Sequence, residues 1–369
     1  MQAPSFDIFC RVVDNFGDIG VCWRLARRLA HMPARHRVRL WVDDLASFAR
    51  IQPDVNPHAP RQELCAVDIV HWTSAPPALA PHDVVIEAFA CHPPKAFLER
   101  MAASNSLWIN LEYLSAEDWV ESCHALPSPQ PNGLRKAFFF PGFTPATGGL
   151  LREDGLIQAR DDWLARPAQR RELQRALGVP DDFLARMTEG SKQVLLFAYP
   201  DAPAPALIRA LDTPEAPSLV LVPAGVCPGL RRGRHGNILV HEFPFLDQAG
   251  FDRLLWSSDL NCVRGEDSLV RALWAGKPLL WHIYPQEDHA HLAKLHAFLE
   301  RSPYPAMVKR SHEAWNQPDA TLASDALAAA LHAERFSEWT RAGAQWCSSL
   351  AGRPDLASSL VEFCKHAGR

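Results

Sequence analysis

Two carboxylates, Asp14 and Asp18, lie four residues apart in the stretch DNFGDIGVCWRLARRLA, together with Gly17 and Gly20. The stretch follows an apolar run over 6–13 and leads into apolar residues at helical spacing. A carboxylate in such a turn either accepts backbone N–H groups and closes the turn, or faces a ligand. The pattern alone favours closing of the turn.

A second polar stretch, RGEDS, follows an apolar run over 260–263 and comprises Arg264, Gly265, Glu266, Asp267 and Ser268. Asp267 or Ser268 is expected to cap a helix over 268–275, whose N-terminus would attract phosphate. Arg264 and Arg271 can add positive charge, although Arg271 can also point elsewhere on the helix. Carboxylates oppose a bare phosphate but bind hydroxyls, so the stretch favours a nucleotide that carries a sugar. A helix with an acidic first turn and no ligand is the alternative.

Aromatic side chains are expected near this second stretch. Phe197 and Tyr199 end an apolar run, and Gln248 and Phe251 begin a helical pattern. Each alone is typical of a core, but as a group they can stack on and hydrogen-bond a nucleobase. Tyr284 and Gln286 follow the next expected strand, over 278–282. The sequence leaves open whether they contact the ligand.

The bulk composition excludes several classes of protein. The 369 residues exceed one ordinary domain, and the formal charge of −4 argues against a protein that mainly binds nucleic acid. Nine scattered cysteines without a C-x-x-C pair are typical of reduced thiols in the cytoplasm. No signal peptide, membrane span or metal site is expected.

Short apolar runs alternate with helical patterns, which indicates an α/β fold with parallel sheets. Strands are expected over 6–13, 38–42, 67–72, 83–88 and 107–111, and again over 193–199, 218–222, 237–242, 260–263 and 278–282. Helices are expected over 19–31, 94–103, 160–177, 205–211, 248–257, 268–275 and 288–301, with helices alone from 321. The Pro- and Gly-rich stretch 126–151 predicts neither a regular helix nor a central strand. Ligands of such sheets bind beyond the carboxyl ends of the strands.

Four long segments resemble one bacterial family, the elongation factor P arginine rhamnosyltransferases (EarP). They are DNFGDIGVCWRLAR, WINLEYLSAEDWVESCHALPSPQP, FFFPGFTPATGGLLRE and RGEDSLVRALWAGKPLLWHIYPQEDHAHLAKL. The resemblance covers nearly the whole chain in order. Its long segments are specific, whereas a short turn or cap alone would be a weak signal.

The resemblance implies a GT-B glycosyltransferase fold with two facing Rossmann-like domains and a C-terminal helical tail. The domains implied are an acceptor domain over 1–155, a donor domain over 156–345 and a helix over 346–369 that packs back on the first domain. The implied donor is dTDP-β-L-rhamnose, and the acceptor is an arginine side chain of elongation factor P. Transfer inverts the sugar carbon, and no metal or other cofactor is expected.

The resemblance also implies roles for single residues. Asp18 is predicted as the catalytic base and Asp14 as its catalytic partner, although these two roles could be exchanged. The predicted donor-binding residues are Asn15, Gly17, Phe197, Tyr199, Gln248, Phe251, Arg264, Glu266, Asp267, Ser268, Arg271 and Tyr284.

Alternatives remain at this point. One is a glycosyltransferase with another donor or acceptor, since spacing distinguishes neither the base nor the sugar. Another is a non-catalytic protein of two domains that binds a nucleotide sugar. An aspartate-nucleophile phosphotransferase is disfavoured, because its two aspartates would lie closer together and beside a magnesium site.

Overall fold

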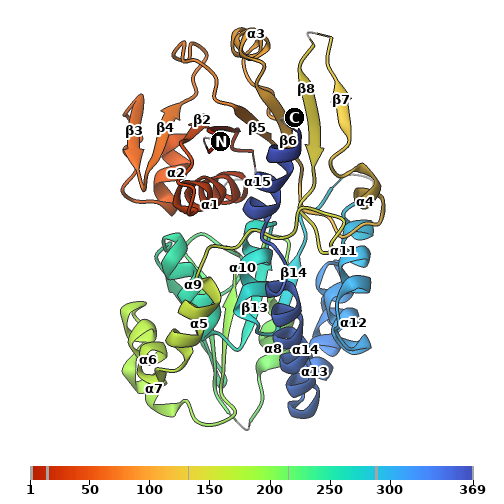
Figure 1. Ribbon diagram of the computed structural model, residues 1–369. Helices are drawn as coiled ribbons and strands as arrows, with labels where there is room; N and C mark the ends of the chain where they lie inside the picture. The colour runs from red at the N-terminus through yellow and green to blue at the C-terminus, as the bar shows by residue number, and fades with distance from the viewer. Residues whose placement is uncertain (1–2, 14–15, 132, 215, 287–289, 368–369) are drawn as a thin grey trace. The chain divides into compact units, whose positions relative to one another are not determined.

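The computed structural model of the chain describes residues 3–13, 16–131, 133–214, 216–286 and 290–367 (Figure 1). Contacts within the chain divide it into two compact units, each containing one sheet. Unit 1 is Met1–Asp154 with Gly352–Arg369, and unit 2 is Gly155–Ala351. The assignment of an acceptor domain and a donor domain to them stays a prediction.

Unit 1 is built on an eight-stranded sheet in the order β3-β4-β2-β1-β5-β6-β8-β7. Its strands are β1 (Phe6–Cys10), β2 (Val38–Val42), β3 (Arg61–Leu64), β4 (Val67–His71), β5 (Val84–Ala88), β6 (Leu107–Leu111), β7 (Pro127–Pro129) and β8 (Arg135–Phe139). Its helices are α1 (Gly17–His31), α2 (Leu45–Ile51), α3 (Lys95–Ser104), α4 (Trp119–Cys123) and α15 (Leu356–Ala367). The edge strands β3 and β7 are antiparallel to their neighbours, and the other pairs are parallel.

Helices cover both faces of this sheet, which is why its central strands are mostly apolar, with one polar residue in each of β1, β2, β5 and β6. Every residue of β1, β2, β5 and β6 is buried. On one face, Phe9 packs with Phe97 and Met101 of α3. Successive side chains of a strand alternate, so Cys10 faces the other way, toward Cys22 of α1.

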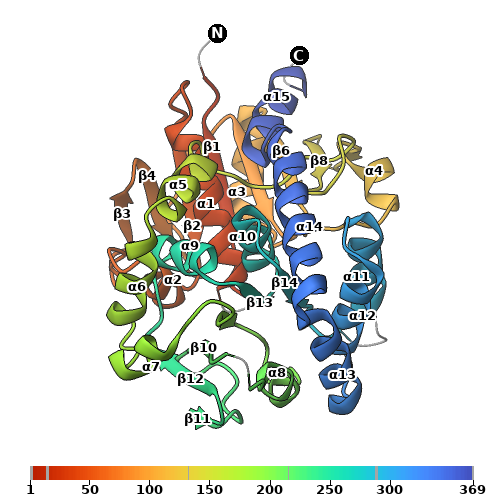
Figure 2. The same ribbon diagram turned by 90° about the horizontal axis from the view of Figure 1, so that it is seen from below.

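Unit 2 has a six-stranded sheet in the order β11-β12-β10-β9-β13-β14, in which β11 is antiparallel to β12 and the other described pairs are parallel. Its strands are β9 (Lys192–Leu196), β10 (Ser218–Pro223), β11 (Gly233–His235), β12 (Ile238–Phe243), β13 (Leu260–Arg264) and β14 (Leu279–His282). Its helices are α5 (Leu156–Leu164), α6 (Pro167–Ala176), α7 (Asp181–Arg186), α8 (Ala204–Leu211), α9 (Gln248–Ser257), α10 (Asp267–Ala275), α11 (Ala290–Arg301), α12 (Ala306–Trp315), α13 (Ala320–Leu331) and α14 (Ala333–Ala351). Figure 2 shows α13 beside α8, and α14 packs against α10.

The last helix of the chain is fixed to unit 1 by buried charge. Arg28 of α1 donates to Asp355 at 3.0 Å and to Asp154 at 2.5 Å. Arg28 and Asp355 are both buried, and the backbone N–H of Leu356 donates to the carbonyl of Leu150 at 3.1 Å. These bonds hold the start of α15 against α1. They also hold it against residues 150–154, where the first part of unit 1 ends.

Three expectations about the elements are wrong. The strand expected over 6–13 ends at Cys10, and the helix expected over 160–177 divides at Pro167, which begins α6. The stretch 126–151 contains β8, which is paired on both sides with β6 and β7 despite the surrounding prolines. From 321 on, the described chain has helices alone, as expected, namely α13, α14 and α15. Residues 288 and 289 of another expected helix lie outside the described residues, and α11 is described from Ala290.

One ion pair lies in the centre of the first sheet. Asp7 of β1 accepts two bonds from Arg39 of β2, at 2.6 and 2.8 Å, and also the indole N–H of Trp41 at 2.8 Å. Asp7 and Arg39 are both buried. A buried guanidinium that loses its carboxylate partner is left uncompensated, which is costly.

We therefore expect Asp7→Ala to lower the free energy of unfolding by about 3–5 kcal/mol. The matched control is Asp68→Ala, because Asp68 also accepts two bonds from an arginine, Arg61, but this ion pair is exposed to solvent. Its loss should lower the free energy of unfolding by at most about 1 kcal/mol. Hydrogen exchange of the β1 and β2 amides, together with urea unfolding, measures both effects. Equal losses in the two variants would contradict the predicted importance of burial.

Candidate active site

The loop after β1 carries the predicted catalytic aspartates. Asp14 and Asn15 lie outside the described residues, and Gly17 is the first residue of α1. Asp18 lies in the first turn of α1, is buried, and accepts the backbone N–H of Val13 on Oδ2 at 2.8 Å. The turn-closing role that the pattern alone favours is thus observed for Asp18, and its role as a base stays a prediction.

Asp43 is a further carboxylate at this edge of the sheet, which the sequence analysis missed. Its Oδ1 accepts the backbone N–H of Val12 at 2.9 Å, and its Oδ2 lies 3.9 Å from Nε of Arg11. Asp43 therefore holds the segment that leads to Asp18. The sequence did contain a signal, because Asp43 directly follows β2, the parallel neighbour of β1.

A buried glutamate near the end of β5 and the strained loop that follows this strand lie at the same edge. Glu87 is completely buried and pairs with Lys136 of β8 through one carboxylate oxygen. Its other oxygen has no hydrogen-bond partner among the described residues and lies 3.6 Å from Nδ1 of His92. Phe89, Ala90 and His92 have φ angles of 56°, 53° and 50°, and such strain gathers at functional sites. Loop 89–92 therefore belongs to the candidate site of unit 1.

Three of the predicted donor residues meet at the carboxyl edge of the second sheet. Arg264 ends β13, and Phe197 and Tyr199 follow its parallel neighbour β9. The guanidinium carbon of Arg264 lies 4.6 Å from the ring centre of Phe197 and 4.9 Å from that of Tyr199. These are cation–π distances, so the arginine is held on the two rings.

Helix α9 contributes two more predicted donor residues. The ring of Phe251 packs edge-on against that of Phe197, with centroids 5.5 Å apart. Gln248 is the first residue of α9 and is buried. Asp247 caps the helix, because its side chain accepts the backbone N–H of Gly250 at 2.7 Å. The cap fixes where α9 begins, and Phe251 places this end of the helix beside the ring of Phe197.

The start of α10 differs from the expectation. Neither Asp267 nor Ser268 is the N-cap; Glu266 holds that position without a side-chain capping bond, and both predicted caps lie in the first turn. Gly265 has a φ of 62°, a left-handed conformation that allows the chain to turn directly from β13 into the helix. The first N–H groups of an α-helix have no acceptor within the helix, so this end can attract an anion.

Arg271 has a structural partner. Its guanidinium donates two bonds to the carboxylate of Asp252 in α9, at 2.9 and 2.7 Å, and both side chains are buried. The pair ties α10 to α9. A direct contact of Arg271 with the donor stays a prediction.

His282 at the end of β14 is another residue that the sequence analysis missed. Its Nδ1 accepts the backbone N–H of Tyr199 at 3.2 Å, so that nitrogen carries no proton. Burial lowers the pKa of His282 to about 4, with Arg264 and His291 adding to the decrease and Asp201 opposing it. Tyr284, two residues later, is 55% exposed and packs edge-on against Tyr199 with centroids 5.3 Å apart.

Metal-binding clusters and membrane-spanning helices are both absent from the described part of the chain. No three or more His, Cys, Asp or Glu side chains gather there in an arrangement that could hold a metal ion. No helix of that part is long and apolar enough to cross a membrane.

Comparison with known proteins decides the family. The sequence profile of the family described as "Elongation-Factor P (EF-P) rhamnosyltransferase EarP" matches residues 6–365. The chain belongs to the EarP family. It is 46% identical to the protein-arginine rhamnosyltransferase of Pseudomonas putida, over 98% of this chain and 99% of that one. It is 41% identical to the enzyme of the same name from Shewanella oneidensis, over 99% and 98% of the two chains.

Solved structures confirm the fold. The chain is similar to a structure described as the structural basis for EarP-mediated arginine glycosylation of translation elongation factor EF-P, with a TM-score of 0.65 and 32% identity over 99% of both chains. The spinosyn rhamnosyltransferase SpnG, at 12% identity and a TM-score of 0.53, covers 98% of this chain and all of that one. The likeness to SpnG concerns the fold alone. The predicted family and the predicted GT-B fold are both confirmed.

The neutral state of His282 predicts how stability depends on pH. An unfolded histidine takes up a proton near pH 6.5, whereas His282 stays neutral to about pH 4 in the folded chain, so acid favours unfolding between these values. We expect His282→Asn, which keeps an acceptor for the N–H of Tyr199, to remove this contribution. Between pH 6 and 5 the wild-type chain should lose about 1 kcal/mol more than the variant. Hydrogen exchange of the β14 amides measures the difference, and parallel pH profiles would contradict it.

Proposed function

We propose that this chain is a protein-arginine rhamnosyltransferase that modifies an arginine side chain of elongation factor P. The observation that carries the proposal is membership of the EarP family over nearly the whole chain, with relatives of that name at 46% and 41% identity. We further propose that it acts in the cytoplasm. All nine cysteines are free thiols, as is usual in that compartment.

The proposed donor is dTDP-β-L-rhamnose, bound at the carboxyl edge of the sheet of unit 2. The aromatic side chains of Phe197, Tyr199 and Phe251 offer apolar surface to a nucleobase, and Gln248 offers an amide to hydrogen-bond it. Arg264 and the start of α10 supply positive charge for the diphosphate. Glu266 and Asp267 are acidic, and carboxylates are suitable acceptors for the hydroxyls of the sugar.

The acceptor is the harder of the two substrates to activate. A guanidinium is protonated at neutral pH and its lone pairs are delocalised, so it is a poor nucleophile. We assign Asp18 as the general base, with Asp14 as its partner. A carboxylate beside the guanidinium localises its charge on one face, orients one nitrogen and takes its proton as the C–N bond forms. Such catalysis contributes about 10²–10⁴-fold in rate.

The same step breaks the bond between the sugar carbon and the diphosphate oxygen. The electron pair of that bond leaves with the diphosphate, whose added charge is stabilised by Arg264 and the α10 N-terminus. Attack from the opposite side of the sugar carbon inverts it, and no covalent sugar–enzyme intermediate is needed. Because Asp18 has little exposed surface, a guanidinium that reaches it loses most of its water, which strengthens their attraction.

Asp18→Asn tests the assignment of the base. Asparagine keeps an oxygen that can accept the N–H of Val13, so the loop should stay closed while the base is lost. We expect kcat to fall by about 10²–10⁴-fold with nearly unchanged dTDP affinity. The rate is measured as the mass gain of purified elongation factor P incubated with dTDP-rhamnose.

The matched control is Asp43→Asn, the same change in the carboxylate that binds the neighbouring N–H of Val12. It should retain kcat within about threefold, because its role is a hydrogen bond that asparagine can still accept. A kcat near the wild-type value in Asp18→Asn would refute the base assignment. Donor binding by the wild-type chain without any mass gain would instead favour a non-catalytic binding protein.

Metal-independent transfer is a separate prediction. Arg264 and the start of α10 are proposed to stabilise the leaving diphosphate, so a chelator should leave the rate unchanged. The test compares rates of rhamnosyl transfer with and without EDTA, on protein first dialysed against the chelator. A rate abolished by EDTA and restored by Mg²⁺ or Mn²⁺ would overturn the prediction.

A further inference from the structure

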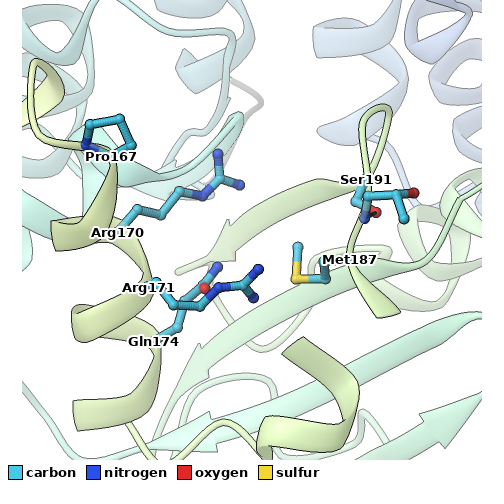
Figure 3. Close-up of a pocket in the computed structure, with 7 residues that line it drawn as sticks. Pro167, Arg170, Arg171, Gln174, Met187 and Ser191 are labelled. Atoms are coloured by element: carbon cyan, nitrogen blue, oxygen red, sulfur yellow. Dashed lines mark hydrogen bonds between the residues drawn. The ribbon is translucent and has the colours of Figure 1, made fainter. Parts of the chain in front are cut away.

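Unit 2 contains a cavity of about 200 Å³ that includes none of the predicted donor residues. Figure 3 shows its lining, which comes from α6 and from the segment between α7 and β9. The lining includes Pro167, Arg170, Arg171, Gln174, Met187 and Ser191. The segment precedes β9, whereas the donor residues Phe197 and Tyr199 follow it, so the cavity lies at the opposite end of that strand.

The two arginines of the cavity differ in how their charge is balanced. Arg170 donates two bonds to Asp259, at 3.2 and 2.6 Å, and the same carboxylate accepts the backbone N–H of Gln193 at 2.8 Å. Arg171 donates one bond, at 2.8 Å, to the carbonyl oxygen of Leu184. Among the described residues, no carboxylate lies within ion-pairing distance of Arg171. Its guanidinium therefore keeps its charge uncompensated and most of its donors available.

A third cation, Lys277, is close enough to Arg170 to feel its charge but does not line the cavity. Lys277 is half-buried, and burial lowers its pKa; Arg170 and Arg160 lower it further, and only Asp259 opposes them. The cavity wall thus carries two cations, Arg170 and Arg171, and of these two Arg170 alone is paired with a carboxylate, that of Asp259. Like charges held together in a partly buried place repel one another, and a bound anion would relieve that repulsion.

We propose that this cavity binds a compact oxyanion, namely a phosphate group, held chiefly by Arg171. A guanidinium presents donors in a planar fork that matches the oxygens of phosphate. Ser191 accepts the backbone N–H of Thr188 at 3.0 Å on its hydroxyl oxygen, which leaves its O–H able to donate to the anion. The site is independent of the proposed transfer reaction, because it uses none of the residues assigned to either substrate.

The test is calorimetric titration of the full chain with inorganic phosphate at constant ionic strength, with and without saturating dTDP. With saturating dTDP, whose proposed site is at the other end of the sheet, we expect saturable binding of one phosphate. Without dTDP, phosphate can also enter the proposed diphosphate site, so the binding that persists with dTDP is the binding assigned to the cavity. Arg171→Met should weaken this binding at least tenfold. Arg175→Met should change it less than twofold, because Arg175 lies on the same helix but pairs with Asp181 and does not line the cavity.

Three outcomes would overturn the proposal: no saturable binding, binding abolished by dTDP, or equal binding by wild type and Arg171→Met. Loss of the bond to Leu184 could also disturb α7, so a second variant separates that effect from loss of charge. Arg171→Lys keeps the charge and should bind phosphate more tightly than Arg171→Met. Unchanged dTDP affinity in all variants shows that unit 2 is folded.

Discussion

Parallel strand pairing is the constraint on which both candidate sites depend. Strands that run in one direction end at one edge, so loops distant in sequence become neighbours there. In unit 1 this places the residues after β1, β2 and β5 together, and in unit 2 it does so for β9, β13 and β14. Polar side chains collect at these edges because the strands between them are buried on both faces.

The same burial explains which parts of the fold could be predicted. Runs such as 38–42 and 107–111 are apolar except for one residue each and are bounded by polar residues, and the strands found there have those limits. The strand β8 could not be found in this way, because its sequence RKAFF begins with two cations inside a Pro- and Gly-rich stretch. Lys136 is tolerated there only since Glu87, from a strand far away in sequence, neutralises it.

Some residues of the candidate sites could be predicted from the sequence and others could not, depending on whether their contacts are with residues distant in the sequence. Aromatic groups near Arg264 could be predicted because each follows or ends an apolar run. The partner of Arg271 could not, because no spacing rule brings Asp252 of a different helix to it. Asp43 and His282 each accept a backbone N–H from a loop that follows another strand of the same sheet. The position of Asp43 directly after a strand was a signal in the sequence, but the bond that it makes was not predictable from it.

The return of the chain to unit 1 has a consequence for biosynthesis. Unit 1 needs Gly352–Arg369, which the ribosome makes only after the whole of unit 2. Until then Arg28 lacks Asp355, and the α1 surface that α15 covers is open to solvent. Unit 2, whose residues are continuous, can therefore fold first during translation, although its residues are made second. Folding of unit 2 before unit 1 would reverse the usual order, in which the N-terminal domain folds before the C-terminal one.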